Sequence, residues 1–525
     1  MMVHVSKLLI QLALVLALSY ASPASGATLR VPKQFKTIQA AIDAAKPGDT
    51  IRVAQGVYKE RIQLKPRIIV RSDGDNSKGK LGLRRAEATI LDGNSIEEKK
   101  PGVIMAADSI LDGFTITKVG QYDETVWKQH HATRGEDLKD EQGTVGHGTS
   151  GIEIRGVDCV VKHCLVHHNG HVGIAIRGLE EHQIAPLVLN NIVYRNMGGG
   201  IGIADGAEPI VSHNRCYENL RAGIGCRNAN PVITNNICHE NIRAGIGNRQ
   251  GSKAIIRGNT CFKNRRAGIG SRMKGTRPII AGNRCYQNDM AGIGSRDNAS
   301  PIIRKNLCYK NKMAGIGTDG AQDVLIIDNE CRENLMAGIG AKNKASVTIL
   351  NNRCTNNKLV AIGVIRQSQA IIQNNKLTRK GGMPPIVAVK DGSTATLVKN
   401  RINGGGVAGV LVQGDVVLEN NHFVSKAQNQ GTAVWVWVNS KAKIIGNQFH
   451  GYRNAVRATK SDVIVVNNTI EKFEKTAILI QKPSSPSYVL NNTAYGDGKQ
   501  LSVVAIDGMD NIVNGNTLKA NHQGP

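Results

Sequence analysis

The chain has 525 residues, with 67 lysines and arginines against 41 aspartates and glutamates, so its formal net charge is +26. It is 41% hydrophobic, and its 58 glycines follow no three-residue period, which excludes a disordered chain and a collagen-like one. So large a positive charge predicts attraction to polyanions such as nucleic acid, anionic lipid or acidic polysaccharide.

Residues 1–26 have the pattern of a cleaved secretory signal peptide. Lys7 precedes an apolar run from Leu8 to Leu18, and small residues follow it. The run is too short to span a bilayer comfortably, and no later stretch of about 18 apolar residues follows. We therefore expect an exported protein, in the periplasm, at the cell surface or outside the cell, with no integral membrane segment. Export favours acidic polysaccharide over nucleic acid as the partner.

Residues 27–117 are expected to form an N-terminal cap and the first coils of a solenoid. Thr37–Ala45, followed by Gly48–Ile51 and Gly56–Glu60, resembles the capping helix and first strands of the right-handed parallel β-helix superfamily with the pectin-lyase-like fold. The resemblance implies a helix over the open end of the solenoid, where strand edges would otherwise be unpaired. The last segment also resembles one signature of pectin methylesterases, but the signatures that supply their catalytic aspartates are absent.

Residues 118–148 form a non-repeating insertion rich in ionisable side chains, and long excursions from a solenoid often carry functional sites. Ten of the fourteen histidines fall between His130 and His239. We expect His168 and His171 to act as acid or base in uronate chemistry, with Asp205 as the nearest acidic residue on a coil.

Two alternative roles for this histidine cluster stay open. The histidines and carboxylates could hold a divalent metal, with calcium as the candidate cofactor, although no HExxH or paired Cys/His spacing is present. They could equally be surface histidines on a loop.

Residues 149–525 contain a repeat of about 23 residues. AGIG or a close variant recurs every 22 to 24 residues from Ala222 to Ala337, and an Asn stands nine residues before the first Gly of each unit. So short a period, with β-branched pairs and no helical periodicity, predicts an all-β fold, a single right-handed parallel β-helix with one coil per repeat. Stacked Asn side chains are expected to hydrogen-bond from coil to coil at a turn.

The position two residues after each Asn is apolar in every unit, so we expect it to point into the core. Seven of the ten cysteines occupy this column: Cys216, Cys238, Cys261, Cys285, Cys308, Cys331 and Cys354. Free Cys packs as a small hydrophobe, although a disulfide framework or a metal tape is the functional alternative. The pairing of Cys159, Cys164 and Cys226, which lie off the column, stays open.

In the AGIG strand, alternation is expected to point Ile inward and both glycines outward, which leaves a flat strip of bare backbone. Cations flank this strip in two columns, Arg221, Arg243 and Arg266 on one side and Arg227, Arg249, Arg272 and Arg296 on the other. At a strand spacing of about 4.8 Å, neighbouring cations repel by roughly 1 to 3 kcal/mol at effective dielectrics of about 20 to 80. Such a ladder favours counter-anions, and a polyuronate or sulfated glycan would supply them. The alternative is a solvated basic face with glycines required by a bend.

An aromatic column from Tyr194 to Tyr309 is expected on the outside of the solenoid. Its rings can stack on each other or on sugar rings.

The family resemblance and the cationic strip together predict an exported protein that acts on an acidic polysaccharide, as a lyase or an epimerase. The epimerase-like Asp-Pro-His-Asp motif is absent, and no complete lyase or hydrolase signature is present. The alternatives are a non-catalytic glycan-binding or cell-surface scaffold protein and a periplasmic accessory protein of the copper-maturation type.

Overall fold

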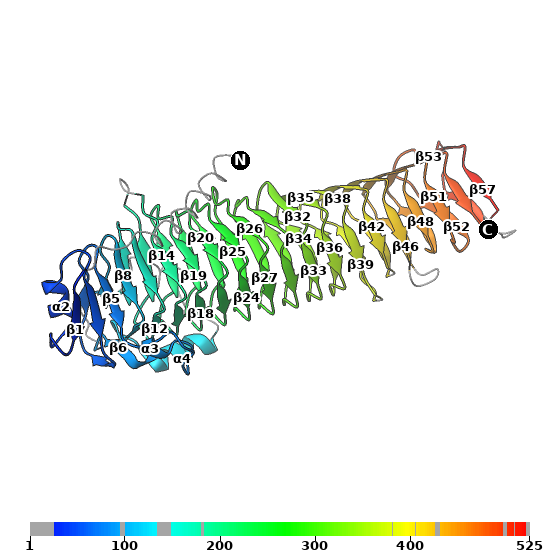
Figure 1. Ribbon diagram of the computed structural model, residues 1–525. Coiled ribbons are helices and arrows are strands. Elements are labelled where there is room, and N and C mark those ends of the chain that lie inside the picture. The colour runs from blue at the N-terminus through cyan, green and yellow to red at the C-terminus, as the bar shows by residue number, and fades with distance from the viewer. Residues whose placement is uncertain are drawn as a thin grey trace.

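The computed structural model describes residues 26–94, 100–133, 149–179, 183–380, 382–404, 406–425, 431–496, 501–508 and 510–520. The chain winds into a long parallel β-solenoid whose coils follow one another from the N-terminal to the C-terminal end (Figure 1). Each coil contributes one strand to each of three parallel sheets, here called A, B and C in chain order. The expected signal peptide and the insertion from 134 to 148 lie outside the described residues.

Sheet A has 20 strands, and equivalent residues of successive coils pair in parallel register. Its strands are β1 (Thr28–Val31), β2 (Thr50–Val53), β5 (Ile69–Ser72), β8 (Ser109–Asp112), β11 (Cys159–Lys162), β14 (Leu187–Leu189), β17 (Ile210–Ser212), β20 (Val232–Thr234), β23 (Ile255–Arg257), β26 (Ile279–Ala281), β29 (Ile302–Arg304), β32 (Val324–Ile327), β35 (Ser346–Leu350), β38 (Gln369–Gln373), β41 (Thr394–Val398), β44 (Asp415–Glu419), β47 (Lys441–Ile445), β50 (Asp462–Val466), β53 (Tyr488–Leu490) and β56 (Ile512–Asn514).

Sheet B follows a tight corner after sheet A. Its strands are β3 (Gly56–Tyr58), β6 (Thr89–Asp92), β9 (Thr115–Thr117), β12 (Leu165–His167), β15 (Ile192–Tyr194), β18 (Arg215–Tyr217), β21 (Ile237–His239), β24 (Thr260–Phe262), β27 (Arg284–Tyr286), β30 (Leu307–Tyr309), β33 (Glu330–Arg332), β36 (Arg353–Thr355), β39 (Lys376–Thr378), β42 (Arg401–Asn403), β45 (His422–Val424), β48 (Gln448–His450), β51 (Thr469–Glu471), β54 (Thr493–Tyr495) and β57 (Thr517–Lys519).

Sheet C completes each coil and contains the AGIG strands. Its strands are β4 (Ile62–Gln63), β7 (Val103–Ile104), β10 (Ile152–Arg155), β13 (Ile174–Arg177), β16 (Ile201–Ala204), β19 (Ile224–Arg227), β22 (Ile246–Arg249), β25 (Ile269–Arg272), β28 (Ile293–Arg296), β31 (Ile316–Asp319), β34 (Ala337–Lys342), β37 (Val360–Val364), β40 (Val387–Val389), β43 (Ala408–Val412), β46 (Thr432–Val436), β49 (Asn454–Thr459), β52 (Thr476–Gln481) and β55 (Ser502–Ile506).

The described residues include three helices outside the sheets: α2 (Ile38–Ala44), α3 (Arg84–Ala88) and α4 (Glu124–Ala132). Helix α2 lies over the first coil with Ile38 and Ile42 fully buried, as the predicted cap should (Figure 1). The Glu60 carboxylate accepts hydrogen bonds from the first backbone N–H groups of α2, which have no partner within the helix. Within the described residues, no helix is long and apolar enough to cross a membrane.

The predicted cysteine column lies in the core. All seven of its members are fully buried, and all ten cysteines of the chain are free thiols. Inward-facing isoleucines of sheets A and C complete this core. The interpretation as a column of small hydrophobes is confirmed, and Cys159, Cys164 and Cys226 form no disulfide.

Two asparagine ladders hold the corners on either side of sheet B. In the first, Nδ2 of Asn236 donates to Oδ1 of Asn259 at 3.0 Å, and the same contact repeats between neighbouring coils from Asn191 to Asn516. The second ladder runs in the same way from Asn169 to Asn357. Each amide also donates to a backbone carbonyl, as Asn236 does to Val211 at 2.9 Å. The ladders therefore satisfy buried backbone groups that the corners would otherwise leave unpaired.

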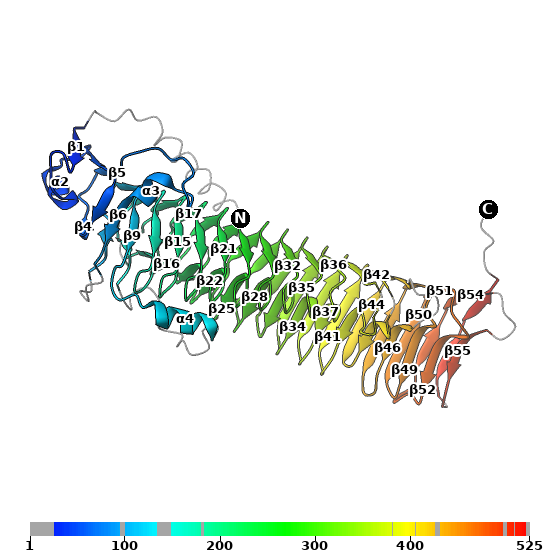
Figure 2. The same cartoon turned by 90° about the horizontal axis from the view of Figure 1, so that it is seen from below.

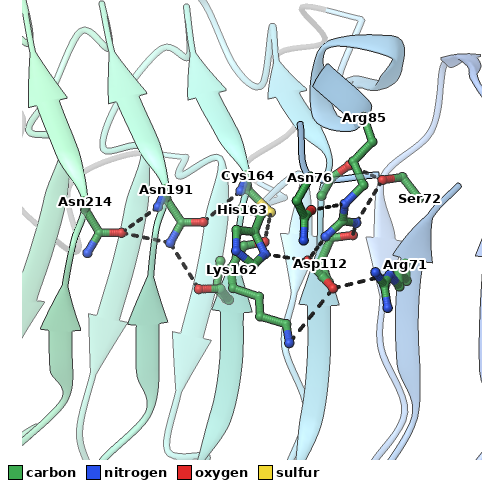
Figure 3. A network of polar contacts seen from close by, with 12 residues as sticks. Arg71, Ser72, Asn76, Arg85, Asp112, Lys162, His163, Cys164, Asn191 and Asn214 are labelled. Carbon is green, nitrogen blue, oxygen red and sulfur yellow. Dashed lines mark hydrogen bonds and ion pairs between the residues drawn. The ribbon is translucent and has the colours of Figure 1, made fainter. Parts of the chain in front are cut away.

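A charged cluster lies next to the N-terminal end of the first ladder (Figure 3). Asn191 accepts a hydrogen bond from the backbone of Cys164, and in the coils before it Arg85 of α3 reaches into the same corner. Arg85 forms an ion pair with Asp112 and donates to the Asp112 carbonyl at 2.7 Å. His163 Nδ1 lies 3.0 Å from the same carboxylate. This cluster anchors α3 to the first coils.

Candidate functional site

The outer face of sheet C carries a flat strip of small residues that runs along the solenoid. It consists of the Ala and second Gly of each AGIG unit, and it is here called the sheet C strip. A Cβ atom added at Gly270 would meet only the Cβ of Ala244, at 3.8 Å, and the equivalent glycines are equally open. The second glycines therefore face outward as predicted, and with the alanines they form a strip of small, mostly half-buried residues.

The first glycine of each unit does not belong to the strip. A Cβ atom added at Gly268 would lie 2.7 Å from the carbonyl oxygen of Gly292 and 2.9 Å from Nδ2 of Asn288. These glycines face the second asparagine ladder, because the chain bends there and sets two successive residues inward. The expectation that both glycines face outward is therefore wrong for the first of them.

One arginine column borders the sheet C strip at the carboxyl ends of its strands. Arg227, Arg249, Arg272 and Arg296 are paired in register on successive strands. The first three are half-buried and Arg296 is exposed, while Arg249 and Arg272 each have a further interaction partner in the protein. Asp319 follows Arg296 in the same column and pairs with Lys342 at 3.1 Å. The run of four stacked cations matches the sequence prediction.

The second arginine column lies differently from the expectation. Arg221 and Arg243 are only 7% and 8% exposed, and Arg266 is half-buried. The residues just before the first two, Leu220 and Ile242, pack beneath Trp127 of α4. Because α4 covers this corner, Arg221 and Arg243 do not form an exposed border of the strip.

The predicted catalytic residues are not brought together. His168 lies at the corner between sheets B and C, before β13, whereas Asp205 follows β16 at the opposite edge of sheet C. Asp205 bridges two arginines, with its carboxylate 3.3 Å from Arg177 and 3.0 Å from Arg227. His171 is buried and has an interaction partner in the protein. Asp205 therefore pairs with Arg177 and Arg227 at the N-terminal end of the arginine column.

Helix α4 lies against the outside of the N-terminal half of the solenoid (Figure 2), and the residues at its start place other polar groups beside His168. The ring of Tyr122, just before α4, meets the ring of His168 edge-on at a centroid distance of 4.7 Å. The Tyr122 hydroxyl donates to Glu124 at 2.6 Å, and Glu124 lies 3.5 Å from Arg195. Sequence reasoning missed this pairing because an inserted segment has no register with the coils, although Tyr122 lies in the segment that the sequence marks as exceptional.

Burial controls the protonation of this cluster. It lowers the pKa of His168, and the positive charge of Arg195 lowers it further. Burial, with the neighbouring His168, lowers the pKa of His167 to about 3. Burial and the hydrogen bond to Glu124 raise the pKa of Tyr122. At neutral pH the imidazoles are therefore neutral and the Tyr122 phenol is protonated; His167 is a very weak base, which leaves His168 as the imidazole of this cluster better able to accept a proton.

The aromatic column stacks on itself along sheet B. Neighbouring rings from Tyr194 to Tyr309 have centroids 4.8 to 5.0 Å apart and lie within 12° of parallel. Arg215 and Arg332 lie over rings of this stack. Since the ring faces already contact each other, the column is not a free sugar platform.

The described residues contain no group of three or more His, Cys, Asp or Glu side chains that could hold a metal ion. Five potential metal-ligating residues of the insertion, Glu136, Asp137, Asp140, Glu141 and His147, lie outside the described residues.

Comparison with known proteins concerns the fold. Among solved structures, the A-module of mannuronan C-5 epimerase AlgE4 from Azotobacter vinelandii is 14% identical, and the match covers 76% of this chain and 94% of that one at a TM-score of 0.34. The periplasmic alginate epimerase AlgG is 14% identical over 70% of this chain and 82% of its own, at a TM-score of 0.38. The pre-mature bacteriophage phi29 gene product 12 is 12% identical, and the match covers 99% of this chain and 74% of that one at a TM-score of 0.44.

No curated protein matches the chain. A family model described as "Protein of unknown function (DUF1565)" matches residues 27–212. A second model, described as "Right handed beta helix region", matches residues 180–298, 270–383 and 385–525. With more than half of its length matched by that model, and with the parallel coils described above, the chain belongs to the right-handed β-helix family.

Proposed function

We propose that the protein, once exported, binds an acidic polysaccharide along the sheet C strip. The observation that carries the proposal is the stack of Arg227, Arg249, Arg272 and Arg296 in register beside a strip without bulky side chains. Cations about 4.8 Å apart repel one another, and Asp205 beside Arg227 and Asp297 beside Arg296 offset this repulsion at the two ends of the run. A polymer with one negative charge per unit would offset it along the whole run. The net charge of +26 adds long-range attraction for such a polymer.

The geometry favours a polymer over a small anion. The strip repeats the same small residues over several coils, and a Cβ atom added at its glycines would meet only alanine Cβ atoms of the strip. A chain of uronate or sulfated units can instead repeat the same weak contact from coil to coil. Arg266, half-buried on the other side of the strip, is in position to contribute, whereas Arg221 and Arg243 are covered.

The test compares two double variants that lose the same charge. Arg249→Ala with Arg272→Ala removes the centre of the column, and Arg257→Ala with Arg304→Ala removes two exposed arginines of sheet A. Binding to polyuronates and heparin is measured at low and high salt, with circular dichroism as a check on folding. We expect the first pair to bind more weakly and with a flatter salt dependence, and the second to stay near wild type. Equal losses in both pairs would mean that net charge alone attracts the polymer, which contradicts the proposal.

A second candidate is β-elimination at the cluster around His168, which the contact with Tyr122 favours. A neutral His168 can remove the C5 proton of a uronate. The Tyr122 hydroxyl, which donates to Glu124 in the structure, would protonate the leaving oxygen after turning this hydrogen bond from Glu124 to the substrate. Epimerisation needs groups on both faces of the sugar ring, but these two rings touch and cannot enclose it. Of the two activities predicted from the sequence, the lyase reaction therefore fits better.

The lyase candidate is tested by the ultraviolet absorbance of the unsaturated uronate product. His168→Ala and Tyr122→Phe should abolish any increase while polymer binding persists. His213→Ala is the matched control, because His213 has a similar positive φ of 58° at another corner and is exposed. No absorbance change with the wild-type protein on any polyuronate, with or without calcium, would remove the lyase and leave the binding proposal intact. Variants of His171 and Asp205 in the same assay decide whether these residues contribute.

A further inference from the structure

A groove lies on a different face from the sheet C strip, along the outside of sheet A in the C-terminal half of the solenoid. It has a volume of about 620 Å³ and follows six successive strands from β35 to β50, ending at Tyr488 of β53. At about 4.8 Å per strand its floor is roughly 24 Å long. The groove is therefore long and narrow, like the footprint of an extended polymer.

The groove lies where sheet A changes its width. The strands from β17 to β29 are three residues long, whereas those from β35 to β50 are five. The added residues extend the sheet towards the corner with sheet C, and small inward residues such as Ala370 and Ala395 line the groove there. This widening distinguishes the C-terminal coils from the AGIG coils.

The lining is amphipathic. One outward column of the groove alternates polar with apolar side chains: Thr348, Ile371, Thr396, Val417, Lys443 and Ile464. The other outward column carries amides, hydroxyls and charges, including Gln369 and Thr394. A ligand with an apolar face and a polar edge would match both columns.

The charges in the groove cancel. Asp415 and Asp462 lie in register on either side of Lys441, and Lys443 is the fourth ionisable residue of the lining. Two carboxylates thus offset two ammonium groups, although the chain as a whole carries a net charge of +26. The groove offers no excess charge to a polyanion, in contrast to the sheet C strip.

We infer that this groove binds an uncharged, unbranched polysaccharide. A pyranose ring has an apolar C–H face and a hydroxyl edge, and it is about as long as the strand spacing of about 4.8 Å, so each sugar can lie over one coil. Every second sugar would then meet an apolar side chain, Ile371, Val417 or Ile464, and the sugars between would meet the polar side chains of the same column. The Tyr488 ring, 40% exposed at the end of the groove, can stack on the terminal sugar. The inference is independent of the proposed function: it assigns a second face and a second ligand class, and together the two faces would let one solenoid join two polymers.

The test uses two variants of one outward column of sheet A. Ile371, in the groove, and Ile302, outside it, are 49% and 39% exposed, so that Ile371→Asp and Ile302→Asp are closely matched. Binding to a panel of neutral gluco-, manno- and xylo-hexasaccharides is measured by calorimetry at low and high salt. We expect at least one hexasaccharide to bind independently of salt, with affinity reduced at least about tenfold by Ile371→Asp, equivalent to about 1.4 kcal/mol, and unchanged by Ile302→Asp.

A second substitution guards against misfolding. Thr396→Trp fills the middle of the groove from its outer face and should block binding without entering the core. The inference is overturned if no neutral hexasaccharide binds the wild-type protein, if the two Asp variants bind equally well, or if salt weakens binding as it does for a polyanion. Self-association that Ile371→Asp abolishes would assign the groove to a second copy of the chain and would also overturn it.

Discussion

Two glycines of one repeat, only two residues apart, should respond oppositely to the same substitution. In Gly268→Ala the new methyl group would lie 2.7 Å from the Gly292 carbonyl oxygen and 2.9 Å from Nδ2 of Asn288. That amide donates to Cys261 O at 3.1 Å and to Asn311 Oδ1 at 3.0 Å. Overpacking costs about 1 to 3 kcal/mol, and disturbing buried hydrogen bonds costs about 1 to 3 kcal/mol more, so we expect a loss of about 2 to 6 kcal/mol.

Gly270→Ala should not destabilise the protein. Its methyl group would contact only Ala244, at 3.8 Å, and removing a glycine from a strand reduces the conformational entropy of the unfolded chain. We expect a stabilisation of up to about 1 kcal/mol.

The assay is thermal unfolding followed by circular dichroism at one scan rate, because a chain of this size need not unfold reversibly. At an unfolding entropy of about 2.1 cal/mol/K per residue, Gly268→Ala should lower the midpoint by roughly 2 to 6 °C, and Gly270→Ala should leave it within about 1 °C of wild type or raise it. Gly292 and Gly294 repeat the two environments in the next coil and provide an independent pair. If Gly268→Ala is harmless, or if the two variants are equally destabilised, the assigned orientation of the glycines is refuted.

Further outcomes follow from the buried charges and thiols. Asp112→Asn should destabilise the protein by about 3 to 5 kcal/mol in urea unfolding, since it leaves Arg85 buried without its counter-charge, whereas Arg71→Ala, at a partly exposed contact of 3.5 Å, should change little. Burial alone would raise the pKa of Asp112, but the hydrogen bond with His163 and the charge of Arg85 outweigh it and hold that pKa below its ordinary value. Asp112 therefore takes up a proton more readily in the unfolded state than in the folded state. Its stabilising effect should be complete above about pH 4 and should decline as pH falls through the lowered pKa of the folded state. A urea midpoint that rises on acidification in the wild type but not in Asp112→Asn would contradict this. Burial raises the pKa of thiols such as Cys226, and all ten cysteines are buried. A thiol reagent should therefore label the native protein slowly, and it should label all ten cysteines in urea. Rapid labelling of the native protein would show that the core is open.

Periodicity predicted the parts of the fold that repeat. The spacing of Asn236, Asn259 and their equivalents predicted stacked amides, and the apolar residues two positions later predicted the buried cysteine column. These inferences succeed because a residue in a solenoid meets its own equivalent in the next coil, so the sequence of one unit specifies the neighbours.

The features that the sequence did not predict depend on departures from the regular repeat. Strict alternation misplaced Gly268, because the bend after the second ladder turns two successive residues inward. The burial of Arg221 could not be read from its column, because α4 covers that corner from an insertion without register. The groove on sheet A was missed for a similar reason, since it depends on the widening of strands whose motifs had already faded from the repeat.

The central claim is that an acidic polysaccharide binds along the sheet C strip, and the most direct test is to label that strip chemically. Since the native cysteines are buried, the Gly270→Cys variant carries a single accessible thiol in the middle of the strip, and Thr234→Cys carries one on the outside of sheet A. The rate of thiol modification is measured with increasing polyuronate at low salt. Binding along the sheet C strip predicts that the polymer slows labelling of the Gly270→Cys variant to saturation and leaves the Thr234→Cys variant unaffected. Equal protection of both sites, or protection of neither, would contradict it.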